Sequence, residues 1–215
     1  MLPTITPTTL DIAPGGEVIL RYQTWDDYET LLQTRQDHAA IKVTFSATTQ
    51  EIRIMAPLPG HGNKSDTLSD LVKYLLRYQG RDWDSFDPIT LKRFQQKGLE
   101  PDHCFYIQNR TAILGKERID LAVDPPPDLV LEVDLTSFTS VEDYEDIGTP
   151  ELWIYRQNTL HIYTFDGQHY QEQNESPLFC GIPVKELIPD SIEQAWREGS
   201  SVALRECEQV LQQLT

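Results

Sequence analysis

The segment "PDLVLEVDLTS", residues 127–137, constrains the fold most, because it combines an apolar run with three acidic residues. Side chains of a β-strand alternate between its two faces. One face would hold Leu129, Leu131, Val133 and Leu135, and the other Asp128, Val130, Glu132 and Asp134. The pattern predicts a strand anchored in the core by its apolar face. The acidic face is typical of either a solvated side of an antiparallel sheet or a metal site.

A second segment, "EPDHCFYIQN" at residues 100–109, predicts a strand that brings another acid to the same place. If residues 101–108 and 128–135 pair antiparallel, Asp102 lies close to Glu132 or Asp134. Mg²⁺ prefers oxygen ligands and takes one or two carboxylates, with water and phosphate oxygens completing its shell. Such an ion activates water and stabilises charge on a phosphate. Asp102, Glu132 and Asp134 therefore allow a Mg²⁺ or Mn²⁺ site, and a solvated acidic strand face stays the alternative at this point, with Asp134 equally open to either.

The remaining pattern predicts an extended arm at residues 1–16 and a single α/β domain at 17–215 with a central mixed β-sheet. Strands are expected at 17–24, as a hairpin at 42–56, at 89–94, and as a meander at 151–173. Helices are expected at 25–38, 65–80, near 140–148 and at 201–214, and a loop at 57–63. Thr24 and Asp27 form a capping box for the first helix, and Asp128 is expected to fix the start of its strand by hydrogen bonding.

The charge balance limits how this protein can bind nucleic acid. There are 18 Lys and Arg against 34 Asp and Glu, a net charge of −16. This excess repels nucleic acid at long range, so such binding must depend on a local basic patch or a bridging divalent ion. Three widely spaced cysteines fit reduced thiols and a cytoplasmic protein. We expect neither a signal peptide nor a membrane partner, since no apolar run approaches the ~20 residues of a membrane span.

Four segments resemble a known family. They are "EIRIMAPLPGHG", "GLEPDHCFYIQN", "DPPPDLVLEVDLTS" and "IGTPELWIYRQNTLHIYTFDGQHY", in that order from about residue 50 to 170. They are similar to the Uma2 family of endonucleases, formerly DUF820, in the PD-(D/E)xK restriction-endonuclease-like superfamily. The resemblance implies a restriction-endonuclease-like α/β core, with a central mixed sheet flanked by helices. It also implies Mg²⁺ held by Asp102, Glu132 and the Val133 carbonyl, DNA as substrate, a lysine that orients or activates water, and, by analogy, a homodimer.

The sequence departs from this family at the lysine. The motif position for lysine is Asp134, and residues 138–146 contain no Lys or Arg. Lys92, on a strand expected beside that of Asp102, and Lys64, at the start of the strongest helix, are the replacement candidates. His61 could contact a phosphate or an acid, although a loop histidine more often bonds to backbone.

Three functions therefore stay open. The first is a metal-dependent endonuclease with Asp102, Glu132 and Lys92 as catalytic residues. The second is a catalytically inactive binding or regulatory protein that kept the fold. The third is a metal-dependent hydrolase of a small phosphoester.

Overall fold

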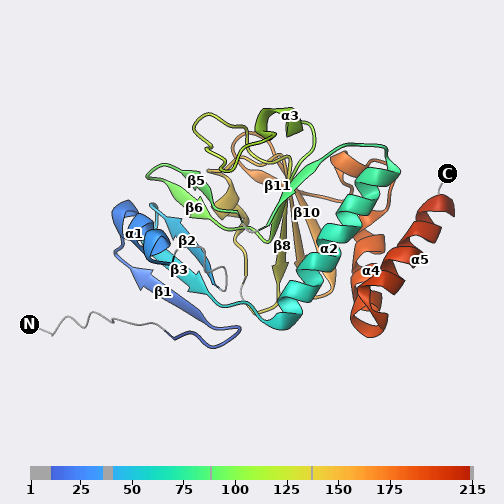
Figure 1. Ribbon diagram of the computed structural model, residues 1–215, viewed down its shortest axis with the longest axis horizontal. Helices are drawn as coiled ribbons and strands as arrows, with labels where there is room; N and C mark the ends of the chain where they lie inside the picture. The colour runs from blue at the N-terminus through green and yellow to red at the C-terminus, as the bar shows by residue number, and fades with distance from the viewer. Residues whose placement is uncertain (1–10, 36–40, 88, 137, 214–215) are drawn as a thin grey trace, which may run out of the picture.

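Two β-sheets with helices packed on them make up the part of the chain that the computed structural model describes, residues 11–35, 41–87, 89–136 and 138–213 (Figure 1). In spatial order, sheet A contains β1 (Glu17–Arg21), β3 (Glu51–Met55), β2 (Lys42–Ser46), β6 (Lys97–Leu99) and β5 (Leu91–Arg93). Sheet B contains β11 (Tyr170–Gln173), β10 (Thr159–Phe165), β9 (Glu151–Arg156), β8 (Leu129–Asp134), β7 (His103–Tyr106) and β4 (Asp84–Phe86). Sheet A is antiparallel, whereas the parallel pair β8–β9 makes sheet B mixed. The predicted mixed sheet is confirmed as sheet B, and sheet A is a second sheet that we had not expected.

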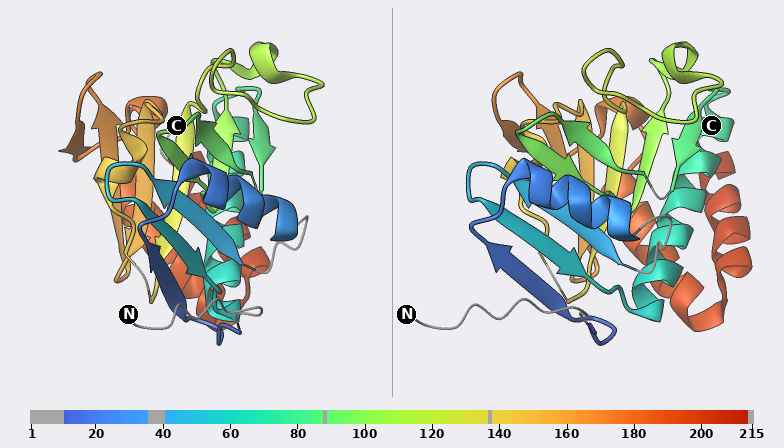
Figure 2. Two further views of the ribbon diagram at one scale, coloured as in Figure 1. Left: turned by 90° about the vertical axis from the view of Figure 1, so that its left-hand side faces the viewer. Right: turned by 60° about the vertical axis from the view of Figure 1, so that its left-hand side comes forward.

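The helices lie on different faces of the two sheets. They are α1 (Trp25–Arg35), α2 (Pro59–Tyr78), α3 (Arg110–Ile113), α4 (Val184–Glu198) and α5 (Ser200–Gln213), with short 3₁₀ turns η1 (Val141–Tyr144) and η2 (Pro177–Phe179). Figure 1 shows α2, α4 and α5 together on one side of sheet B. Figure 2 shows α1 lying across sheet A, where Trp25 and Tyr28 pack on β2 and β3. None of the described helices is both long enough and apolar enough to cross a bilayer.

Strand β8 is buried on both of its faces. Leu129, Leu131 and Val133 pack in one apolar cluster with residues of α2 and α4, and Val130 packs in a second cluster on the opposite face. Each such aliphatic side chain contributes about 1.5–3 kcal/mol by leaving water. Leu135 follows the end of β8 and is 38% exposed, so the prediction that it anchors the strand is wrong.

Helix α2 begins at Pro59, within the segment that the sequence predicted as a loop. Proline suits the first helical position, because the N–H that it lacks would have no partner there and its φ angle already matches a helix. The N–H groups of His61 and Gly62 donate to the Leu58 carbonyl over 2.9 and 3.3 Å. The earlier start makes His61 a helical residue.

Helix α1 begins where the capping box predicted. The Thr24 N–H donates to Asp27 Oδ2 over 2.8 Å, and the Asp27 N–H donates to Thr24 Oγ1 over 3.2 Å. The described helix ends at Arg35. The remainder of the predicted helix, residues 36–38, lies outside the described residues, as do residues 1–10 of the predicted arm.

Strands β7 and β8 pair antiparallel, as predicted, with His103 opposite Leu131 and Phe105 opposite Leu129. Asp102 directly precedes β7, and Glu132 follows Leu131, the last residue of β8 that pairs with β7. The pairing therefore brings the two carboxylates to the point where β8 extends beyond its neighbour.

Candidate metal and catalytic site

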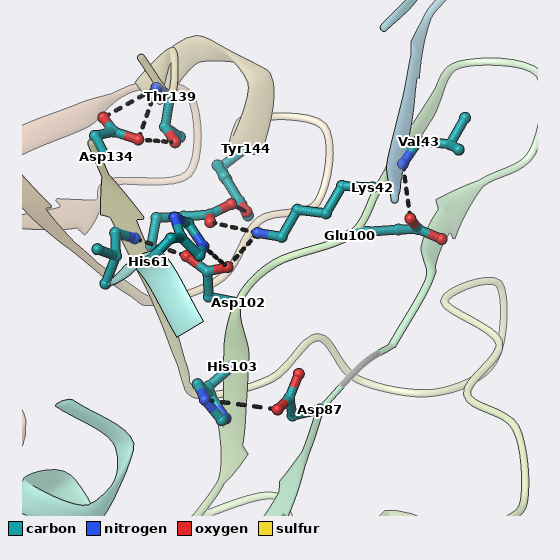
Figure 3. A network of polar contacts seen from close by, with 12 residues as sticks. Lys42, Val43, His61, Asp87, Glu100, Asp102, His103, Asp134, Thr139 and Tyr144 are labelled. Carbon is teal, nitrogen blue, oxygen red and sulfur yellow. Dashed lines mark hydrogen bonds and ion pairs between the residues drawn. The ribbon is translucent and has the colours of Figure 1, made fainter. Parts of the chain in front are cut away.

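A single lysine links the two predicted carboxylates. Lys42, the first residue of β2 in sheet A, extends its ammonium to sheet B (Figure 3). Its Nζ lies 2.5 Å from Asp102 Oδ1 and 3.2 Å from Glu132 Oε2. The sequence predicted that the two acids meet but gave no indication that a cation from another sheet lies between them.

Both carboxylates have further hydrogen-bond partners. Asp102 Oδ1 is 2.7 Å from His61 Nε2, near the start of α2. Asp102 Oδ2 accepts the Val133 N–H over 2.7 Å. Glu132 Oε1 accepts a short hydrogen bond from the Tyr144 hydroxyl of η1. Elements from both sheets and from α2 thus fix the orientation of the two acids.

Burial and charge shift the pKa values in opposite directions. Burial acts to raise the pKa of Asp102, but Lys42 and His61 outweigh it and hold that pKa below its ordinary value. Burial raises the pKa of Glu132 to about 7, because the attraction of Lys42 only partly offsets it. Burial acts to lower the pKa of Lys42, but Asp102 and Glu132 together raise it above that of an ordinary lysine. Lys42 therefore stays an ammonium at neutral pH.

The donor set fits a hard divalent cation. Two carboxylates face one positive charge, and Mg²⁺ is commonly held by one or two carboxylates together with water. The N–H and C=O of one strand residue point to the same side of the strand. The Val133 N–H contacts Asp102, so the Val133 carbonyl points to the side of β8 on which Asp102 lies. A third carboxylate or imidazole ligand is not found, since no cluster of three or more His, Cys, Asp or Glu suited to a metal occurs among the described residues.

Asp134 binds other groups. Its carboxylate accepts hydrogen bonds from Arg156 Nε over 2.8 Å and from Arg156 Nη2 over 2.5 Å. It also accepts the N–H of Thr139 over 3.0 Å and the Thr139 hydroxyl over 2.8 Å. These bonds neutralise the acid and tie the end of β8 to β9 and to the segment before η1. The structure thus places Asp134 beside the site with its oxygens engaged.

Neither lysine predicted from the sequence contacts the two acids. Lys92 lies on β5, which pairs with β6 in sheet A, and its Nζ is 2.9 Å from Glu29 on α1. The neighbours of β7 are β4 and β8, so the expectation that the strand of Lys92 lies beside that of Asp102 is wrong. Lys64 lies over the rings of Tyr155 and Trp196, 5.5 and 5.8 Å from their centroids.

Lys42 and Tyr144 were not predicted as site residues from the sequence. Lys42 begins a strand that was predicted correctly, but nothing in the local pattern shows that sheet A meets sheet B at this residue. Tyr144 lies in a predicted short helix and is 1% exposed. For His61, the structure shows the contact with an acid rather than the more common contact with backbone.

Two cavities adjoin the lysine. The larger, about 360 Å³, is bordered by the start of α2 and by the segments that precede β5 and β7. The smaller, about 80 Å³, is bordered by Glu132, Arg53 and Thr139. Both include Lys42, His61 and Glu100 in their walls, so the lysine stands where the two cavities meet.

The fold is that of a nuclease-like α/β protein. The crystal structure of "a putative nuclease belonging to DUF820" from Anabaena variabilis ATCC 29413 is similar, with a TM-score of 0.52 and 15% sequence identity over 84% of this chain and 98% of that one. At this identity the likeness shows the fold. Residues 25–196 match the Uma2 family, described as "Putative restriction endonuclease", and the chain belongs to that family. No curated protein matches the chain.

Proposed function

We propose that the protein is a divalent-cation-dependent endonuclease that hydrolyses phosphodiester bonds of DNA. The observation that carries this proposal is the convergence of Asp102 and Glu132 on one cation, the Lys42 ammonium, at 2.5 and 3.2 Å. Family membership and the nuclease-like fold support the same class of reaction.

Asp102, Glu132 and the Val133 carbonyl are the groups that would hold Mg²⁺ or Mn²⁺. A bound divalent ion supplies an activated water and stabilises negative charge on the phosphate. The net reaction adds water across one P–O bond, which leaves a phosphate monoester on one fragment and a hydroxyl on the other. His61 and the Val133 N–H hold Asp102 in place, and Tyr144 does the same for Glu132.

Lys42 takes the part of the lysine that the motif lacks at position 134. Because its pKa is raised, it remains protonated and does not accept a proton from water. It can donate hydrogen bonds to a phosphate oxygen or to the attacking water, and its charge offsets the negative charge that builds in the transition state. The role is therefore orientation and charge stabilisation.

A second candidate is a binding or regulatory protein that has lost catalysis. The observation that favours it is the sequestration of Asp134 by Arg156, because the motif position then offers neither a lysine nor a free group. Both candidate functions are compatible with the fold and with the two acids. A cleavage assay distinguishes them.

Cleavage assays on supercoiled plasmid and on circular single-stranded DNA, with Mg²⁺ or Mn²⁺ and with EDTA, test the proposal on four proteins. We expect the wild type to cleave at least one of the two substrates, and Glu132→Gln and Lys42→Met to lose at least about a hundredfold of the rate, the lower end of what one oxyanion-stabilising donor supplies. Lys185→Met removes the same charge from a residue that contacts β11 and should cleave as the wild type does. Cleavage in EDTA, or undiminished cleavage by Glu132→Gln, would refute the metal-dependent mechanism. No cleavage by any protein would leave the non-catalytic candidate.

A further inference from the structure

We infer that the DNA strand to be cleaved enters this site with an unpaired nucleotide. The nucleoside of that nucleotide occupies the cavity of about 360 Å³ beside Lys42 and Asp102. The inference rests on the proposed function and names its substrate class, single-stranded or unpaired DNA rather than a continuous duplex. Three features of the described residues carry it: the depth of the acids, the lining of the cavity, and the pairing of the nearby cations.

The acids lie too deep for the backbone of an intact duplex. Asp102 is 5% exposed and Glu132 is 8% exposed. Asp102 borders the larger cavity and Glu132 borders the smaller one. A duplex presents its phosphates on a convex surface. Enzymes that must bring part of a nucleotide into a pocket act on single strands or turn that nucleotide out of the stack, as those that modify bases do. A nucleotide that is already unpaired reaches these acids without the free-energy cost of unstacking and unpairing.

The larger cavity suits a nucleoside in size and chemistry. Its volume of about 360 Å³ falls among pockets that hold small organic ligands. Ile41, Leu58 and Ile89 supply apolar walls for the faces of a base. Asp87 and His103 supply polar groups in the same cavity, with 3.7 Å between Asp87 Oδ2 and His103 Nε2 (Figure 3). A carboxylate accepts hydrogen bonds from base amino groups, which favours cytosine, adenine or guanine over thymine.

The cations around the two cavities offer no row of contacts to a duplex. Arg35 forms two bonds of 2.6 Å with Glu100. Lys42 binds Asp102 and Glu132, and Arg53 lies 3.6 Å from Glu51. Duplex binding depends on many phosphate contacts from free lysines and arginines. A short unpaired segment held by shape and by one or two cations fits this surface better.

Oligonucleotide binding by fluorescence anisotropy in EDTA tests the inference apart from cleavage. One fluorescent sequence is compared as a single strand and as a blunt duplex. Because unpairing costs a few kcal/mol, we expect the single strand to bind about tenfold more tightly or better, where tenfold corresponds to about 1.4 kcal/mol. Equal or tighter binding of the duplex, or no binding of either, would overturn the inference.

A substitution at Gly62 locates the nucleotide. A Cβ at Gly62 meets no atom within 4 Å, and the residue borders the larger cavity. Gly62→Phe should therefore fold, obstruct the cavity and abolish the preference for the single strand. Gly62→Ala, which makes the same backbone change without filling the cavity, should keep the preference. If both variants keep the preference for the single strand, the nucleotide does not lie in the larger cavity.

The outcome for cleavage is read separately. Preference for the single strand without cleavage in Mn²⁺ would remove the proposed endonuclease function and leave the binding inference standing. Cleavage of blunt duplex as fast as of single strand would support the endonuclease and overturn the inference.

Discussion

At the scale of single residues, Lys42 determines what the two acids can do. Its ammonium neutralises one of two buried negative charges and occupies the position between the carboxylates. Asp134, at the position where the family motif has lysine, is bound by Arg156 instead. The positive charge beside Glu132 therefore comes from the start of β2 in the other sheet, and any divalent ion must compete with it.

Removing the Lys42 charge should weaken the metal-free protein and strengthen metal binding. Lys42→Met leaves Asp102 and Glu132 buried without their shared cation, and breaking such a pair costs about 3–5 kcal/mol. We expect the free energy of unfolding in EDTA, measured with urea, to fall by about that amount, and Mn²⁺ to restore most of it. Lys185→Met provides the matched loss of charge. A variant as stable as the wild type in EDTA would contradict the buried bridge.

The metal-free protein should also show a Glu132-dependent response to pH. The pKa of Glu132 is about 7 in the folded protein against 4.5 ordinarily, so the folded state binds this proton more tightly. Its contribution to stability is complete below pH 4.5 and is lost as pH rises through 7. The pKa of Asp102 is lowered, so its contribution is instead lost on acidification below 3.8.

The Glu132→Gln variant isolates the first of these effects. In EDTA, the free energy of unfolding of the wild type relative to this variant should decline between pH 4.5 and 7. Urea unfolding across that range measures the difference. A difference that stays constant or grows with pH would mean that Glu132 is ionised in the folded protein throughout.

At the scale of elements, the junction of β7 and β8 sets the separation of the two acids. Asp128, which directly precedes β8, accepts the backbone N–H groups of Ile107, Gln108 and Asn109 over 2.6, 2.9 and 3.0 Å. The prediction that Asp128 fixes the start of its strand is confirmed. These bonds tie the end of β7 to the start of β8 and hold the register that places Asp102 near Glu132.

Weakening this junction should destabilise the fold. Asp128 is 1% exposed, and hydrogen bonds to a charged acceptor contribute about 1.5–3 kcal/mol each. We expect Asp128→Asn to lower the free energy of unfolding by about 3 kcal/mol, measured by urea denaturation at neutral pH. Asp82→Asn is the comparison, because the Asp82 side chain is 84% exposed and pairs only with Arg110 among the described contacts. Equal effects of the two changes would show that Asp128 is not a structural acceptor.

The sequence predicts those parts of the site that depend on local pattern. Alternation within two segments was enough to place Asp102 and Glu132 together, because antiparallel pairing fixes which residues meet. Lys42 could not be found this way, since its contact joins two sheets. Lys92 was assigned to the wrong neighbour for the same reason: a three-residue strand does not indicate which sheet it joins. The early start of α2 at Pro59, which positions His61, was hidden by two glycines that resemble a loop.

At the scale of the whole molecule, charge separates this protein from general DNA-binding proteins. The net charge is −16, and the cations at the site are paired with acids. The smaller cavity contains two cations, Lys42 and Arg53. Nucleic-acid binding should therefore involve few phosphate contacts.

The salt dependence of binding measures the number of phosphate contacts. With about two phosphate contacts, the logarithm of the affinity for a single strand should fall with the logarithm of salt concentration with a slope of about −1.4. Anisotropy titrations in EDTA at several KCl concentrations give the slope. A slope of about −4 or steeper would indicate six or more contacts, and hence a basic surface that the described residues do not form.

The claim that Asp102 and Glu132 hold a divalent cation is tested most directly by calorimetric titration of Mn²⁺ into the wild type and Glu132→Gln. Glu142→Gln, which removes an acid on η1 that bonds to Ser140, is the matched control. We predict one Mn²⁺ per chain in the wild type and the control, and at least about tenfold weaker binding in Glu132→Gln, as expected when one of two carboxylate ligands is lost. Equal binding in all three proteins, or no binding in the wild type, would contradict the site.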